Sequence, residues 1–61
     1  MKLLDLLEIT SEHDIVNIID CNIKKVISRY DGKNSISSSL NEKRVILQFV
    51  ENNELYIIID L

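Results

Sequence analysis

Two side chains in this sequence could act as catalytic groups near neutral pH, and they are His13 and Cys21. Histidine is the side chain that most readily exchanges a proton near neutrality, and His13 is the only one in the chain. It lies between Glu12 and Asp14 in a polar stretch, and sequence neighbours seldom supply the positioned partner that acid–base catalysis needs. Asp20 precedes the cysteine, and its negative charge disfavours the reactive thiolate. We expect a solvated loop histidine and an unreactive turn thiol.

Metal and phosphate sites need combinations of residues that this chain does not offer. One cysteine and one histidine are too few for a tetrahedral zinc site. The acidic residues are spread along the chain without the spacing of a calcium loop. Gly32 is the only glycine, so the glycine-rich context of a phosphate loop is missing. We therefore expect no metal, no cofactor and no enzymatic activity.

Basic side chains gather around the first of two expected hairpins and form a candidate patch for an anion or an acidic partner. The net charge of the whole chain is −3, whereas nucleic-acid binders are usually basic. A nucleic-acid- or nucleotide-binding module is therefore the alternative function, and affinity that falls steeply with salt would support it. Solvated lysines that protect a strand account for the same residues. The candidate patch consists of Lys24, Lys25, Arg29 and Lys33.

The size of the chain limits how it can be stabilised. Its 61 residues form one domain, residues 1–61, near the lower limit for folding alone, and such domains usually rely on disulfides, a metal or a partner. A single cysteine excludes an internal disulfide, and a free thiol is typical of a reducing cytoplasm. No stretch reads as a signal peptide or a membrane span. Oligomerisation or an unusually apolar core remains, and the hydrophobic content of 46% is consistent with both. We expect a homo-oligomer, most simply a dimer.

The hydrophobic pattern predicts an α+β domain in the order helix, two strands, short helix, two strands. Leu3, Leu4 and Leu7 mark one face of a short N-terminal helix over residues 2–8. Alternating apolar side chains predict strands over residues 14–20 and 24–30. We expect two antiparallel hairpins, joined by a short helical linker, in one four-stranded antiparallel sheet.

The polar linker between the hairpins carries two structural signals. Gly32 is the residue best able to adopt a positive φ angle, and we expect the chain to turn there. Ile36 and Leu40 lie four residues apart, which favours a helical turn capped by Asn34 or Ser35.

Residues 44–50 and 54–61 predict the second hairpin, and its register decides which side chains reach the core. A two-residue loop at Asn52–Asn53 pairs Phe49 with Tyr56 and mixes polar residues into the core face. A three-residue loop that also includes Glu51 pairs Phe49 with Leu55 and keeps one face wholly apolar. We prefer the three-residue loop. Its core face consists of Val45, Leu47, Phe49, Leu55, Ile57 and Ile59.

The opposite face of this hairpin is also largely apolar in the preferred register. A sheet with one solvated face normally alternates apolar and polar residues, so we expect this face to meet a second copy or a target protein. Tyr56 is the expected hot spot. The candidate interface consists of Ile46, Val50, Tyr56 and Ile58.

Several segments together resemble the small accessory proteins of phages and prophages of low-GC bacteria. They are the MKLLDLLE helix, the hairpin that ends in YDGK, the linker with Ile36 and Leu40, and the final RVILQFVENNELYIIIDL hairpin. The resemblance is one of pattern, covers most of the chain and includes no catalytic residues. It implies an early or accessory viral protein in the host cytoplasm, a class that includes inhibitors of host immunity. We therefore expect a non-enzymatic protein that binds a host defence protein stoichiometrically, without membrane association.

Overall fold

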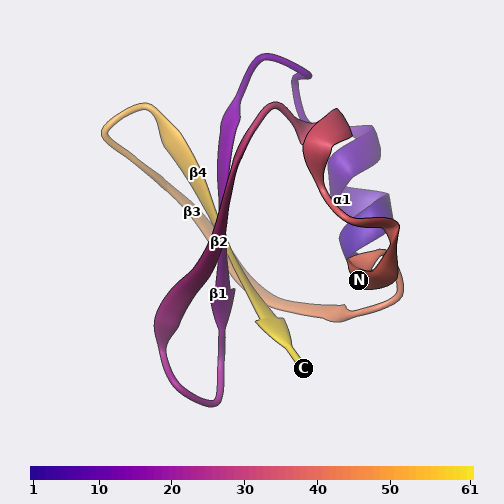
Figure 1. The fold of residues 1–61 in the computed structure, drawn as a ribbon, viewed down its shortest axis with the longest axis vertical. Coiled ribbons are helices and arrows are strands. Elements are labelled where there is room, and N and C mark those ends of the chain that lie inside the picture. The colour runs from indigo at the N-terminus through magenta and orange to yellow at the C-terminus, as the bar shows by residue number, and fades with distance from the viewer.

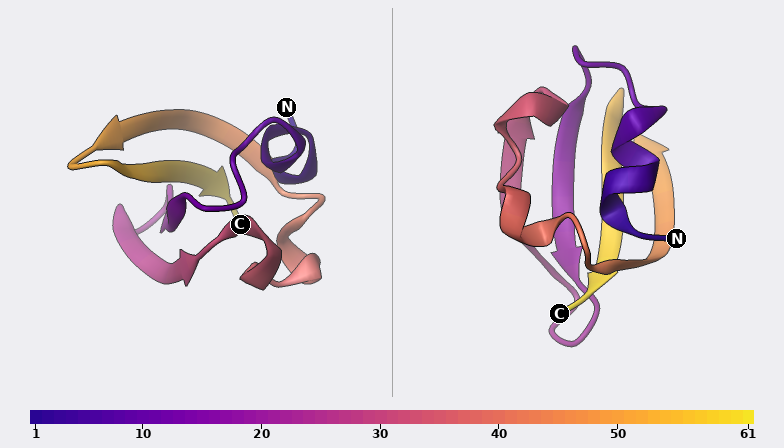
Figure 2. Two further views of the ribbon diagram at one scale, coloured as in Figure 1. Left: turned by 90° about the horizontal axis from the view of Figure 1, so that it is seen from above. Right: turned by 90° about the vertical axis from the view of Figure 1, so that its right-hand side faces the viewer.

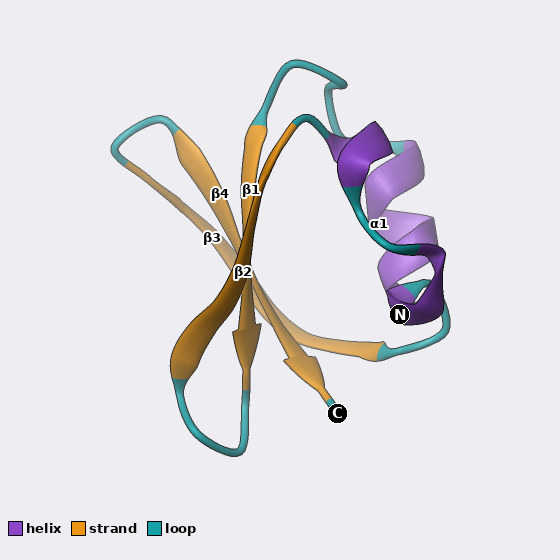
Figure 3. Ribbon diagram, in the orientation of Figure 1, coloured by secondary structure: helices purple, strands orange, loops and turns teal.

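The computed structural model describes all 61 residues and is built around a four-stranded sheet that is covered on one side (Figures 1 and 3). The elements are helix α1 (Leu3–Glu8), strands β1 (Ile15–Asp20) and β2 (Lys25–Asp31), the 3-10 turns η1 (Lys33–Ser35) and η2 (Ser38–Leu40), and strands β3 (Arg44–Glu51) and β4 (Glu54–Asp60). The α+β class and the order of the elements are confirmed. None of the helices has the length and apolar character needed to cross a membrane.

The strands lie in the order β2-β1-β4-β3, with β1 and β4 at the centre. Each hairpin is antiparallel, as expected, but β1 and β4 run parallel to each other. The sheet is therefore mixed, and the expectation of a wholly antiparallel sheet was wrong in this respect. The cause is the linker, which crosses one face of the sheet and brings β3 to the far edge (Figure 2). From there β4 returns beside β1 in the same direction, as crossover connections permit.

The core lies between α1 and the two central strands. β1 and β4 contribute every second side chain to it, because successive side chains of a strand point to opposite faces. The helix turns Leu6 rather than Leu4 inward, and Leu4 is 39% exposed. Only six residues long and without a side-chain N-cap, α1 depends on this packing to remain helical. The buried cluster consists of Leu3, Leu6, Leu7, Val16, Ile18, Leu55, Ile57 and Ile59.

The loop between β3 and β4 has two residues, so the preference for three was wrong. Asn52 and Asn53 both adopt positive φ angles, 52° and 64°. Two successive residues of this kind form the hairpin turn whose twist matches that of the adjoining strands. Phe49 consequently pairs with Tyr56, as in the alternative register.

A β-bulge then shifts the register of the same hairpin. It lies between Val45 and Leu47, and it restores the expected pair of Val45 with Ile59. A bulge inserts one extra residue in one strand, so Val45 lies on the core side, although the two-residue loop alone would turn it to the other side. Leu47 and Phe49 were expected in the core, but they lie on the face away from it, because the two-residue loop pairs them with Ile58 and Tyr56.

The linker follows the sequence signals in part. Gly32 has a φ angle of 97°, which confirms the expected turn. Its N–H donates to the carbonyl oxygen of Asp14 at 3.1 Å, which ties the end of β2 to the chain before β1. The expected helical turn is present as two short 3-10 turns, and Ser37, rather than Asn34 or Ser35, accepts a hydrogen bond as the cap of η2.

Candidate functional site

The side of the sheet that faces away from α1 is not covered by any other element (Figures 1 and 2). The pairing register shows which side chains lie there, because directly opposite partners point to the same side. We call this surface the open face. It consists of Asn17, Ile19, Val26, Arg29, Leu47, Phe49, Glu54, Tyr56 and Ile58.

The centre of the open face is apolar and contains an aromatic pair. The rings of Phe49 and Tyr56 stack across the second hairpin, with centroids 5.1 Å apart and 3° between their planes. Together with Cys21 and Lys24, the side chains of Ile19, Phe49 and Ile58 line a hollow of about 390 Å³. Further out, Leu47 is 55% exposed and Val26 is 49% exposed. Contiguous apolar surface of this kind marks interaction sites in folded proteins.

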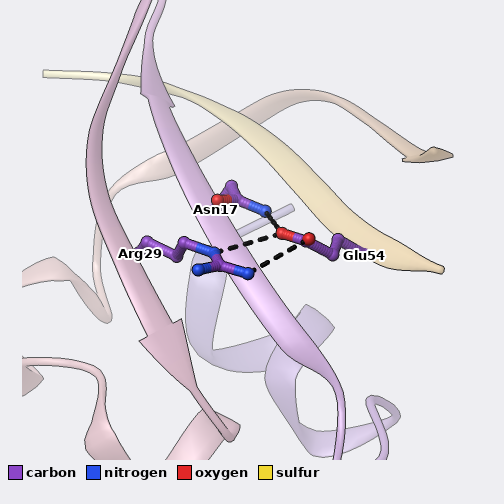
Figure 4. Close-up of polar contacts among 3 residues, drawn as sticks. All are labelled: Asn17, Arg29 and Glu54. Atoms are coloured by element: carbon purple, nitrogen blue, oxygen red, sulfur yellow. Dashed lines mark hydrogen bonds and ion pairs between the residues drawn. The ribbon is translucent and has the colours of Figure 1, made fainter. Parts of the chain in front are cut away.

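One corner of the open face is polar and links three strands (Figure 4). Arg29 donates to Glu54 from Nε at 3.2 Å and from Nη2 at 3.1 Å, and Asn17 donates to Oε1 of the same carboxylate from Nδ2 at 2.9 Å. Asn17 is the one buried polar side chain of the protein. The hydrogen bonds from Asn17 and then Arg29 lower the pKa of Glu54, because they favour its ionised form. Arg29 and Asn17 are therefore both held by Glu54 within the chain.

We expect Glu54→Gln to lower the melting temperature most at pH 7 and progressively less towards pH 3. A carboxyl whose pKa is lowered by folding stabilises the fold above its unfolded-state pKa, and this stabilisation is lost as the pH falls through the folded-state value. The difference between wild type and variant should therefore shrink below about pH 4. Thermal melts followed by circular dichroism across this pH range measure it.

Glu12→Gln is the matched control for this measurement. Glu12 is exposed and takes part in none of the ion pairs. Its variant should follow the wild type at every pH. A Glu54→Gln difference that stays constant from pH 7 to pH 3 would contradict the role assigned to the ionised carboxylate.

The structure separates the four residues of the candidate interface. Tyr56 and Ile58 lie on the open face, at its centre. Val50 pairs with Leu55 and points to the other side, where it is 71% exposed. The tip of this hairpin lies away from α1 (Figure 1). Ile46 lies at the bulge and is 48% exposed.

Leu47 and Phe49 are members of the open face that the sequence reasoning had assigned to the core. The two-residue loop, weighed as an alternative, contained the signal that places Phe49 beside Tyr56. The same loop places Leu47 opposite Ile58, on the same side. No signal in the sequence marked the bulge, which returns Val45 to the core side.

The four basic residues of the candidate patch do not form one free cationic surface. Arg29 is held by Glu54, and Lys33 donates to a carbonyl oxygen of α1 at 2.8 Å. Lys24 and Lys25 remain at the turn between β1 and β2, where Lys24 has a φ angle of 58°. The patch is thus reduced to two neighbouring lysines.

The candidate catalytic residues have ordinary surroundings. His13 lies exposed in the loop after α1. Cys21 is half-buried, and its thiol donates to Asp60 at 3.9 Å. Partial burial, followed by the charges of Asp60 and Asp20, raises the pKa of Cys21, which disfavours the reactive thiolate. No three side chains of the types that bind metal ions come together.

Comparison of the chain with models of known families, with curated proteins and with solved structures finds no match in any of the three. The fold and the site nevertheless define a class of protein. It is a small α+β domain with a mixed four-stranded sheet, one face of which forms the core and the other of which is an open, largely apolar surface.

Proposed function

We propose that this protein acts by stoichiometric binding of another protein through the open face. The observation that carries the proposal is the uncovered apolar surface of that face, which includes Leu47, Phe49 and Ile58. Binding of this kind needs a complementary surface rather than reactive groups. A chain of 61 residues can supply such a surface, and its one half-buried cysteine and one loop histidine are not required.

The layout of the open face suits a protein partner. Typical interfaces have an apolar centre with aromatic anchors and a polar rim. Here the stacked rings of Phe49 and Tyr56 are held in place before binding, so little side-chain freedom is lost when a partner packs on them. Arg29 and Glu54 form a polar rim on one side. Binding of a nucleic acid is less favoured, because the chain carries a net charge of −3. Only two lysines of the basic patch remain without a partner.

The partner that we propose is a host defence protein, and the setting is the host cytoplasm. This part of the proposal is supported by the pattern-level resemblance to small phage accessory proteins. It also agrees with the short length of the chain and with the excess of apolar strand surface, which are typical of proteins that block a larger one by covering part of its surface.

The proposal is tested by capture from an expressing bacterial host with tagged wild type and with Ile58→Lys, followed by mass spectrometry. Any protein captured by wild type is then purified and titrated calorimetrically. We expect a complex of fixed stoichiometry whose affinity falls at least about tenfold in Ile58→Lys, because a charge is placed in the apolar centre.

Ile23→Lys is the control for this experiment. Ile23 is 55% exposed in the turn between β1 and β2, so the same charge is introduced away from the centre of the face. This variant should bind as wild type does. If the captured protein binds Ile58→Lys equally well, or if wild type captures no protein in stoichiometric amount, the proposal is wrong.

A further inference from the structure

The outer edge of β3 is covered along only part of its length. At its start, Met1–Leu3 runs antiparallel beside it, with Lys2 opposite Arg44. The N–H of Val45 donates to the carbonyl oxygen of Met1 at 2.7 Å, and the N–H of Leu3 donates to that of Lys43 at 2.8 Å. Beyond Val45 no other segment pairs with this edge.

Apart from the bulge at Ile46 and the charge of Glu51 at its end, the uncovered part of the edge lacks the usual protection. Ile46–Val50 is uncharged, contains no proline and is exposed throughout. Natural proteins normally protect a free strand edge with charged residues, proline or a covering segment, because its backbone groups can pair with another strand. The other edge strand, β2, carries Lys25 and Arg29. Of the two edge strands, β3 is therefore the one whose free stretch lacks charged residues that would oppose pairing with another strand.

The two-residue loop determines which backbone groups of β3 point outward. The residues that flank such a loop, here Glu51 and Glu54, form a hydrogen-bonded pair, and such pairs alternate with non-hydrogen-bonded pairs along an antiparallel ladder. Phe49 therefore directs its N–H and C=O toward β4. Gln48 and Val50 direct theirs outward, where a second strand can reach them.

We propose that two copies of this chain pair antiparallel through their β3 edges, with the two-fold axis at Gln48. A two-fold axis perpendicular to a sheet places one residue opposite its own counterpart. The uncharged free stretch, between Val45, whose N–H donates to Met1, and Glu51, is Ile46–Val50. Its centre is Gln48, a residue whose backbone groups point outward. The position of the free stretch and the direction of its backbone groups therefore both place the two-fold axis at Gln48.

This arrangement is complementary in chemistry as well as in backbone pattern. Leu47 of one copy lies opposite Phe49 of the second copy, and both belong to the open face, so the two open faces join into one apolar surface. No charged residue within the paired stretch meets a like charge. At each end Glu51 approaches the segment of the second copy that carries Lys2 and Arg44, where the Lys2 ammonium is paired with Glu42 at 2.7 Å. Glu51 therefore meets a surface of mixed charge rather than one of like charge.

A charge exchange at Gln48 tests both the dimer and its register. Wild type should be dimeric by sedimentation equilibrium. Gln48→Lys and Gln48→Glu should each raise the dimer dissociation constant at least about tenfold, because each places two like charges at the axis. An equimolar mixture of the two variants should recover dimers of near wild-type affinity, because the introduced lysine then faces the introduced glutamate. Ile23→Lys, which lies in the turn between β1 and β2 and not on β3, should remain dimeric.

Hydrogen exchange gives a second readout at single residues. The amides of Gln48 and Val50 should exchange slowly in the wild-type dimer and rapidly in Gln48→Lys, whereas core amides such as that of Ile57 should be unaffected. The inference is overturned if wild type remains monomeric up to about 1 mM. It is also overturned if either single variant dimerises as wild type does, or if the mixture does not recover the dimer.

These outcomes are independent of the proposed binding function. Ile58→Lys should leave the dimer intact, because Ile58 lies on a central strand away from the β3 edge. If the protein does not dimerise, the capture experiment still decides whether the open face binds a target protein. If no target protein is captured, sedimentation equilibrium and hydrogen exchange still decide whether the chain dimerises.

Discussion

Replacing Ile57 with alanine is expected to remove about 2–5 kcal/mol of unfolding free energy. Ile57 lies on β4 between two neighbouring strands, and its side chain has no exposure at all. The loss combines the transfer energy of the deleted methyl and methylene groups with the cavity that remains. The whole stability of a domain of this size is roughly 3–9 kcal/mol, so the variant should be close to unfolded or fully unfolded at room temperature.

The matched control is Leu47→Ala, on the neighbouring strand of the same hairpin. Leu47 is 55% exposed, and its truncation should cost less than about 1 kcal/mol. An unbulged hairpin with the three-residue loop would have made both residues core, so this pair of variants also tests the register. Urea denaturation followed by circular dichroism, at concentrations low enough to favour the monomer, measures both. Equal losses of stability would contradict the register set by the two-residue loop.

Gly32→Ala is expected to be the second most damaging substitution. Gly32 has φ 97° and ψ 143°, in a region that residues with a β-carbon rarely enter, and the backbone strain alone costs about 1–3 kcal/mol. A β-carbon at this position would also lie 2.9 Å from the carbonyl oxygen of Glu12, a backbone atom that has to move to make room. The hydrogen bond to Asp14 would be disturbed by that movement.

Asn53→Ala provides the comparison for this prediction. Asn53 also has a positive φ angle, 64°, but in the left-handed helical region and at an exposed hairpin tip. Alanine there should cost about 1 kcal/mol, because the region is only moderately unfavourable and nothing crowds the side chain. Thermal melts of both variants should rank Gly32→Ala well below Asn53→Ala. A Gly32→Ala protein as stable as wild type would show that the turn can adopt another conformation.

Local sequence pattern was sufficient for the α+β class, for the order of the elements and for the turn at Gly32. These features depend on residues close together in the chain, namely the spacing of leucines in α1, the alternation in the strands and the single glycine. The same reasoning failed within β3 because it required one face of an unbroken hairpin to be wholly apolar, which favoured the three-residue loop. The two-residue loop places Leu47 and Phe49 on the open face, and the bulge at Ile46 then returns Val45 to the core side.

The candidate site depended on contacts between segments far apart in the chain. In the sequence, Asn17 is a polar residue within an otherwise apolar strand. The residue that accepts its hydrogen bond, Glu54, lies 37 positions further along the chain. The parallel pairing of β1 with β4 brings these two strands side by side, and the crossing linker makes that pairing possible. The same topology leaves β3 at an edge, where Met1–Leu3 covers only its beginning. Periodicity indicates which side chains are apolar, but only the packing of distant segments determines which apolar surface remains uncovered.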